Sequence, residues 1–205
     1  MLTDLKTADL LDQLAAAAPV PGGGSAAALI GAAAAALVVM VARLTAAKKT
    51  MAHLRADMER IVAQGQTLQA TLTAAVDRDA DAYAGVLAAL RLPRADDGEK
   101  AARQQALDKA MATAALVPLE TARSAAALMD LAARVVADGL PSARSDALVA
   151  LMAARTAVRA GVCNVRINLG SVADPAAAAT LSKEADALEL QAARREDEIL
   201  ERFSF

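Results

Sequence analysis

The chain is poor in the residues that bind metals, form disulfides or favour strands. It has one cysteine, Cys163, and one histidine, His53, among its 205 residues. An internal disulfide, a cysteine-based zinc site and a histidine-rich metal site are therefore excluded. Aromatic residues make up 1% of the chain, and no window alternates polar and apolar residues with the period of a strand. We expect neither a β-sheet nor a bound metal.

The chain also lacks an excess of basic charge and an apolar leader. Its 22 lysine and arginine residues against 24 aspartate and glutamate residues give a net charge of -2, which argues against a nucleic-acid partner. Asp4, Lys6 and Asp9 fall where the apolar centre of a signal peptide would lie. These features predict a cytoplasmic protein that does not bind nucleic acid.

The chain is rich in alanine. Alanine accounts for 58 of the 205 residues and is the strongest intrinsic helix former. A core with few large side chains gains contact area when helix backbones approach closely, which favours long packed helices and often an oligomer. The composition predicts an all-α fold: one domain over residues 1–205, a bundle of about six to seven long helices, with one buried alanine-rich helix.

Residues 14–42 carry no charge, and a stretch of this length can span a bilayer. It consists mostly of alanine and glycine, whereas lipid-facing helices favour leucine, isoleucine and phenylalanine. We therefore predict no membrane partner and a helix buried inside the bundle, from Ser25 as N-cap to about Ala46. A small membrane-associated helical protein is the alternative.

Proline and glycine mark the expected ends and interruptions of the other helices. The pattern predicts helices at about 7–17, 51–90 and 97–137, another starting at Ser142 or Ser145, and a last one at about 175–203. Gly65 is expected to kink the second of these. Pro118 is expected to kink or break the third, because proline has no backbone N–H to donate.

A glycine-rich loop precedes the alanine-rich helix and consists of Pro21, Gly22, Gly23, Gly24 and Ser25. Consecutive glycines let a ligand approach the main chain, and free N–H groups at a helix start can bind an anion or a carbonyl oxygen. The lysine of a GxxxxGK phosphate-binding loop is missing. The loop is therefore either a tight turn between packed helices or a ligand site.

A carboxylate interrupts an apolar helix face. Asp79 continues the three-four spacing of an apolar stripe, whereas Asp77 lies on another side of the same helix. The stripe contains Leu72, Val76, Tyr83, Val86, Leu87 and Leu90. Burial is costly for a carboxylate and raises its pKa towards the range useful for acid–base catalysis. The alternative is a structural partner for a buried arginine or a helix end.

Two further polar groups lie in the second half of the chain. Asn164 and Asn168 are four residues apart and share a helix face, where two amides can read the donors and acceptors of a heterocycle. Arg144, Ser145 and Asp146 form the other group. Ser145 and Asp146 also fit the simpler role of a helix cap.

These motifs follow one another in a definite order. From the N-terminus they are Pro21-Gly22-Gly23-Gly24-Ser25, Lys48-Lys49, Val76-Asp77-Arg78-Asp79-Ala80, Leu92-Pro93-Arg94, Glu99-Lys100, Val117-Pro118-Leu119, Arg144-Ser145-Asp146 and Asn164-Val165-Arg166-Ile167-Asn168-Leu169. The order resembles the cyclodeaminase domain of formiminotransferase-cyclodeaminase and the related stand-alone methenyltetrahydrofolate cyclohydrolases of bacteria. The resemblance covers nearly the whole chain and does not include the formiminotransferase half.

The resemblance implies an all-helical, homodimeric enzyme that acts on folate-bound one-carbon groups and needs no metal or redox cofactor. It places a catalytic aspartate in the Asp77/Asp79 motif, and the apolar stripe favours Asp79 of the two. The glycine-rich loop and the two asparagines would position the pterin. Lys48, Lys49 and Arg144 are expected to meet the glutamate carboxylates, including those of polyglutamylated folates. Ser145 and Asp146 are further candidates for substrate binding.

The reaction expected first is the conversion of 5-formiminotetrahydrofolate to 5,10-methenyltetrahydrofolate. N10 attacks the formimino carbon, ammonia leaves, and one carboxyl group moves the protons. One alternative is the cyclohydrolase reaction, in which water attacks the same carbon of 5,10-methenyltetrahydrofolate. Another is a helical module that binds folate without catalysis. The motifs do not distinguish the cyclodeaminase reaction, which releases ammonia, from the cyclohydrolase reaction, which consumes water, because both reactions use the same carbon.

Overall fold

A computed structural model describes residues 1–203, and within this range every regular element is a helix. The α-helices are α1 (Thr7–Ala15), α2 (Gly23–Ala47), α3 (Arg55–Leu90), α4 (Asp97–Asp138), α5 (Arg144–Leu169) and α6 (Pro175–Phe203). Three short 3₁₀ segments accompany them: η1 (Leu2–Asp4), η2 (Lys49–Leu54) and η3 (Pro141–Ala143). The predicted all-α bundle is confirmed, with six α-helices in the described residues, of which α1 is short.

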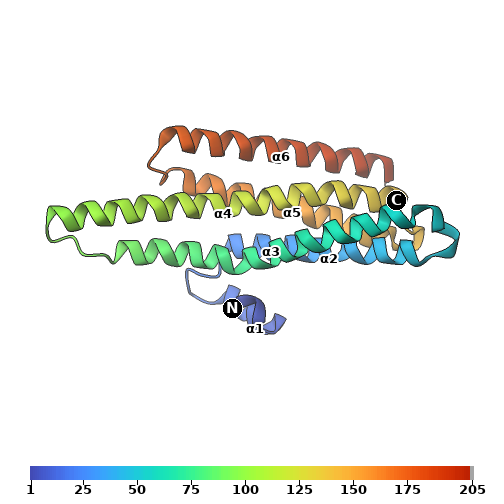
Figure 1. Cartoon of the computed structure of the whole chain (residues 1–205), viewed down its shortest axis with the longest axis horizontal. Helices are drawn as coiled ribbons and strands as arrows, with labels where there is room; N and C mark the ends of the chain where they lie inside the picture. Colours follow the sequence, from blue (N-terminus) through green and yellow to red (C-terminus); the bar gives the residue numbers. More distant parts are fainter. Residues whose placement is uncertain (204–205) are drawn as a thin grey trace.

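Helices α2 to α5 lie along one another in an elongated bundle, and α6 lies along α4 and α5 (Figure 1). The short helix α1 sits on the outside of the bundle (Figure 1). Helices α3 and α4 form a long hairpin that projects beyond α2 and α5 at one end. The start of α2 therefore meets the side of this hairpin rather than its tip.

The alanine-rich helix α2 forms the centre of the core, as the sequence predicts. Its fully buried side chains are small, and they include Ala28, Ala34, Ala35, Val38, Val41 and Ala42. By length and composition, α2 and the segment Pro141–Leu169 could each cross a membrane, but 61% of the most apolar window of α2 is buried inside the bundle. This burial by neighbouring helices explains why α2 carries no charge before Arg43, near its C-terminal end.

Glycines let the helices approach closely in this core. A Cβ atom placed on Gly65 of α3 would lie 2.8 Å from Cγ2 of Val39 on α2. Helix α3 runs without a break through Gly65. The missing side chain of Gly65 makes room for α2.

Two helix starts differ from the expectations. Helix α2 begins at Gly23 with Gly22 as its N-cap, so Ser25 lies inside the first turn and its side chain caps nothing. Helix α5 follows Ala143 and has no side-chain cap, because η3 leads directly into it. Pro118 does not break α4, which continues from Asp97 to Asp138.

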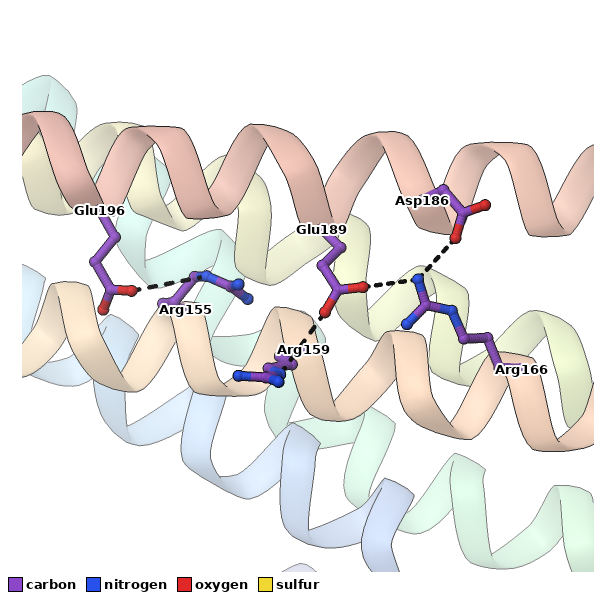
Figure 2. A network of polar contacts seen from close by, with 6 residues as sticks. All are labelled: Arg155, Arg159, Arg166, Asp186, Glu189 and Glu196. Atoms are coloured by element: carbon purple, nitrogen blue, oxygen red, sulfur yellow. Dashed lines mark hydrogen bonds and ion pairs between the residues drawn. The ribbon is translucent and has the colours of Figure 1, made fainter.

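Helix α6 is held by ion pairs to α5 as well as by apolar packing. It buries only Ala185, Ala192 and Ile199. Figure 2 shows the network that compensates for this: Arg166 bonds Asp186 and Glu189 at 2.7 Å each, Arg159 pairs with Glu189 at 3.7 Å, and Arg155 pairs with Glu196 at 3.8 Å. Each such pair is worth only about 0.2–1 kcal/mol at a surface, so the network mainly fixes the register of α6.

Candidate active site

A cavity of about 180 Å³ lies where the start of α2 meets α3, α4 and the end of α5. It is smaller than the roughly 300–1,000 Å³ of a pocket that encloses a whole drug-sized ligand, so it can enclose only part of a ligand of that size. Its lining consists of Pro19, Val20, Gly22, Gly23, Gly24, Asp79, Ala82, Tyr83, Ala114, Asn164, Ile167 and Asn168. The structure therefore brings together the glycine-rich loop, Asp79 and both asparagines.

The carboxylate of Asp79 lies directly against the first turn of α2. A Cβ atom placed on Gly24 would lie 2.0 Å from Oδ1 and 2.5 Å from Cγ of Asp79. Real Cβ atoms essentially never approach so closely, so no residue but glycine fits here without displacing the carboxylate. Gly24 thus determines how near Asp79 can come to the start of the helix.

Ser25 holds Asp79 from the same turn. Its hydroxyl donates to Oδ2 of Asp79 at 2.9 Å and is also 2.9 Å from the carbonyl oxygen of Val76. Burial raises the pKa of Asp79 above its ordinary value, although hydrogen bonds from the Ser25 hydroxyl and backbone N–H act in the opposite direction. The result is a partly buried carboxyl group with a raised pKa at the edge of a cavity, as acid–base catalysis requires.

Backbone donors face the same region. The first helical hydrogen bond of α2 runs from the N–H of Ala26 to the carbonyl of Gly22 at 3.0 Å. The N–H groups of Gly23 and Gly24 therefore have no partner within the helix. Such groups bind an anion or a carbonyl oxygen readily, and here they lie beside the carboxylate of Asp79.

Asp77 does not line the cavity. It lies on another side of α3 and accepts hydrogen bonds from the backbone N–H of Leu2 and, at 2.7 Å, from the hydroxyl of Thr3. Burial alone would raise the pKa of Asp77, but these bonds hold it below its ordinary value. Asp77 therefore anchors the N-terminal segment to α3, and the structure does not bring it together with Asp79.

The residues expected near the glutamate tail lie at the other end of the bundle. Lys48 follows the last residue of α2, about 37 Å from the glycine-rich loop along a helix of this length. The start of α5 is close by, since the N–H of Leu140 donates to the hydroxyl of Thr45 at 2.9 Å. Residues at this end, which we call the lysine end, are Lys48, Lys49, Arg144, Ser145 and Asp146. Within one chain they do not reach the cavity.

The sequence reasoning did not single out Tyr83 and Ile167 as site residues, although both line the cavity. Tyr83 is four residues after Asp79 on α3, and the apolar stripe already places the two on one helix face. Ile167 lies between the two asparagines and is 80% exposed. Among residues 1–203, no three His, Cys, Asp or Glu side chains gather in a way that could hold a metal ion.

Comparisons with known proteins agree on one family. The model of the family described as formiminotransferase-cyclodeaminase matches residues 6–187. A methenyltetrahydrofolate cyclohydrolase from Methylorubrum extorquens is 39% identical over 93% of this chain and 92% of its own length. The formimidoyltransferase-cyclodeaminase of Sus scrofa is 35% identical over 66% of this chain but only 25% of its own length. The crystal structure of a formiminotetrahydrofolate cyclodeaminase from Thermotoga maritima has a TM-score of 0.87 and 26% identity, covering 98% of this chain and 96% of that one.

Proposed function

The chain belongs to the formiminotransferase-cyclodeaminase family, and on that premise we propose that it is a methenyltetrahydrofolate cyclohydrolase with Asp79 as its acid–base group. It would add water to 5,10-methenyltetrahydrofolate and release 10-formyltetrahydrofolate. The motifs alone favoured the cyclodeaminase reaction. Support for the hydrolytic one comes from the relative that matches over almost the full length of both chains.

The position of Asp79 carries the catalytic part of the proposal. The methenyl bridge of the substrate bears a positive charge shared between N5 and N10, which a carboxylate at the edge of the cavity attracts. Asp79 takes one proton from the attacking water as the oxygen bonds to the bridging carbon. The carbon–N5 bond then breaks, N5 receives that proton from Asp79, and the hydroxyl proton leaves to solvent as the formyl group forms. One proton is released per turnover, and Asp79 returns to its carboxylate form.

Ser25 supports both protonation states of Asp79. When Asp79 is charged, the Ser25 hydroxyl donates to it. When Asp79 is protonated, it can donate to the Ser25 oxygen while the hydroxyl proton turns to the carbonyl of Val76, which is equally near. The change of state therefore needs only a hydroxyl rotation, and the N–H groups of Gly23 and Gly24 are available to hold the oxygen on the reacting carbon.

The cyclodeaminase reaction remains a second candidate because of the fold. The cyclodeaminase from Thermotoga maritima superimposes over 98% of this chain. In that reaction N10 attacks the formimino carbon, and the leaving ammonia and N10 exchange protons with the same carboxyl group. The two reactions differ in the attacking nucleophile and not in the position of the acid–base residue.

Purified protein should be offered the two substrates separately. Loss of the methenyl absorbance from 5,10-methenyltetrahydrofolate, beyond the uncatalysed rate, is expected. Growth of that absorbance from 5-formiminotetrahydrofolate, with no hydrolysis of the methenyl compound, would replace our assignment by cyclodeaminase.

Asp79→Asn tests the catalytic role. The amide keeps the shape of the side chain but can neither accept nor return the proton, so kcat should fall by about 10²–10⁴. Affinity for tetrahydrofolate, measured by titration calorimetry, should change by less than about threefold. Asp77→Asn is the matched control two residues away, and its kcat should stay near that of the unmodified protein. Near-normal turnover in Asp79→Asn would exclude this residue as the acid–base group.

We also propose that the chain forms a homodimer. Apolar side chains are exposed along neighbouring faces of α2 and α5, and contiguous patches of this kind often mark interaction sites. They belong to Ala33, Ala36, Met40, Leu44, Val149, Met152 and Ile167. A twofold axis perpendicular to α2 near its midpoint would set the lysine end of the second copy beside the cavity of the first. The lysine end of one chain could then contact a substrate in the cavity of the other, although the lysine end and the cavity lie about 37 Å apart within one chain.

Mixing two inactive or weakened variants tests this arrangement. Asp79→Asn lacks the acid–base group, and a Lys48→Ala/Lys49→Ala double variant should have a raised KM for polyglutamylated substrate. In mixed dimers one of the two sites would hold intact Asp79 and intact lysines, restoring about a quarter of normal activity at low substrate concentration. No restoration, or a monomer by light scattering, would contradict the composite site.

A further inference from the structure

The middle of α4 contains a carbonyl group that its own helix cannot satisfy. In an α-helix the carbonyl of one residue accepts from the N–H four residues later. The residue four positions after Ala114 is Pro118, which has no N–H. Ala114 is buried and lines the cavity. Leaving its carbonyl without a partner would cost about 1–3 kcal/mol.

Asn168 of α5 supplies the missing donor. Its side-chain nitrogen Nδ2 donates to the carbonyl of Ala114 at 2.8 Å. A carbonyl oxygen can only accept, so the atom that faces it must be the NH₂ group of the amide. The chemistry of the contact therefore fixes which way the amide points. The oxygen Oδ1 of Asn168 accepts no hydrogen bond from any residue in the range 1–203.

Asn164, one turn earlier on α5, is oriented in the same way. Its Nδ2 donates to the carbonyl of Ala160 at 2.8 Å. Its amide lies against the main chain of Gly23, since a Cβ placed there would be 3.6 Å from Nδ2 and 3.7 Å from Oδ1. The NH₂ group is again committed to backbone, and Oδ1 has no donor among the described residues. These two residues are the only asparagines in the chain.

We propose that Asn164 and Asn168 present two oxygen acceptors to the cavity, and that they recognise the donor edge of the pterin, its 2-amino group and N3–H. This inference rests on the proposed folate substrate and specifies how the substrate is bound. One N–H of each amide is already bonded to a backbone carbonyl, whereas both amide oxygens are free to accept, so these residues are assigned to substrate donors. A site built to accept from a substrate N–H group discriminates strongly against an analogue that lacks it.

Pro118 acts as a positioning residue in this arrangement. If residue 118 had an N–H, that group would bond Ala114 within the helix and release the amide of Asn168. The released amide could then turn its NH₂ group into the cavity. Pro118→Ala should therefore raise KM while leaving kcat nearly unchanged. It should also raise the melting temperature, because proline is unfavourable inside a helix. A proline with only a structural role would not link higher stability to weaker substrate binding.

The first experiment compares 5,10-methenyltetrahydrofolate with its 2-desamino analogue, in which hydrogen replaces the amino group. The unmodified protein should prefer the natural substrate by about tenfold to a hundredfold in kcat/KM. Asn164→Leu should reduce this ratio towards unity through KM. In the double variant Pro118→Ala/Asn168→Leu the new N–H at position 118 satisfies Ala114. This variant can therefore lose the acceptor without leaving a buried carbonyl unpaired, and it too should show a lower ratio.

Thr180→Val is the matched control, because it also removes one polar side chain whose hydroxyl bonds a backbone carbonyl, here Ala176 at 2.9 Å on the exposed side of α6. Its ratio should equal that of the unmodified protein. An unchanged ratio in both asparagine variants, or equal use of the two substrates by the unmodified protein, would overturn the proposal.

Equilibrium binding separates this inference from the proposed reaction. Tetrahydrofolate and its 2-desamino analogue should differ in Kd by a similar factor even if the protein hydrolyses neither methenyl compound. Absence of turnover with this discrimination intact would refute the cyclohydrolase assignment but support the recognition of the donor edge. Turnover of the methenyl compound, without discrimination between tetrahydrofolate and its 2-desamino analogue, would support the cyclohydrolase assignment but refute the recognition of the donor edge.

Discussion

The contact between Gly24 and Asp79 makes the substitution Gly24→Ala a direct test of the site. The added Cβ would lie 2.0 Å from Oδ1, whereas ordinary contact begins at 3.4 Å. The carboxylate must therefore retreat by about 1.4 Å or rotate away. Either movement breaks the bond that Ser25 donates to Asp79 at 2.9 Å. The variant keeps every proposed catalytic group and changes only where one of them stands.

The expected effect on catalysis is large and the effect on stability is modest. A displacement of about 1 Å at a reacting group costs about a hundredfold in rate, so kcat/KM should fall by at least that factor. Overpacking costs about 1–3 kcal/mol, but alanine is favoured over glycine within a helix by about 0.5–1 kcal/mol. We expect the free energy of unfolding to fall by about 2.5 kcal/mol at most.

The assay combines initial rates with urea denaturation of four proteins: the unmodified chain, Gly24→Ala, Asp79→Ala and the double variant. Removing the Asp79 carboxylate removes the clash, so in that background Gly24→Ala should be neutral or slightly stabilising. Gly85→Ala is the control for the change of residue type, since nothing lies within 4 Å of a Cβ placed on that glycine. It should raise stability by about 0.5–1 kcal/mol and leave kcat unchanged.

Two results would refute this reasoning. The first is a Gly24→Ala variant with near-normal kcat/KM, which would mean that the position of Asp79 against α2 is not needed for turnover. The second is strict additivity of the two substitutions in the unfolding free energy, which would mean that the added methyl group does not meet the carboxylate.

The remaining predictions concern charge and packing. Because the pKa of Asp79 is raised in the folded state, that state binds more protons than the unfolded chain, and the buried charge costs stability at neutral pH. Asp79→Asn should therefore melt at a higher temperature at neutral pH, and its advantage should shrink as pH falls through the pKa of Asp79. In the unmodified protein kcat/KM should decline over that same range, at higher pH than for an ordinary aspartate, as stopped-flow rates across pH would reveal. Asp77 has a lowered pKa, so its stabilising effect is present above the ordinary aspartate pKa and lost as pH falls further. Urea titrations should accordingly show Asp77→Asn to be less stable at neutral pH and nearly equal in acid. Gly65→Ala should lose about 1–3 kcal/mol of stability, because its Cβ would meet Val39, and calorimetry can compare it with Gly85→Ala.

Part of the site could be read from the sequence because it depends on local spacing. Asp79 falls on an apolar stripe of α3, and the structure places it at the cavity with its pKa raised by burial. Asn164 and Asn168 share a face of α5 and line the same cavity. Helical periodicity fixes such relations within one element regardless of how the elements pack.

Another expectation failed because it concerns how elements meet. Ser25 has the residue type of an N-cap, but its hydroxyl is taken by Asp79 and Val76 of the neighbouring helix. Here a tertiary contact overrides the local preference of the residue. At Gly65 the structure shows a role that the sequence did not predict, since its missing side chain accommodates Val39 of α2.

Composition and periodicity by themselves determined that this chain is a helical bundle around an alanine-rich helix, because alanine favours helices and small side chains require close packing. Only the tertiary structure decided that Asp77 binds the N-terminal segment, that the start of α5 lies near the end of α2, and that Asn168 reaches the carbonyl left free by Pro118. The reason is physical: spacing along a helix fixes the face on which a residue lies, whereas the neighbour across the interface depends on how whole helices pack.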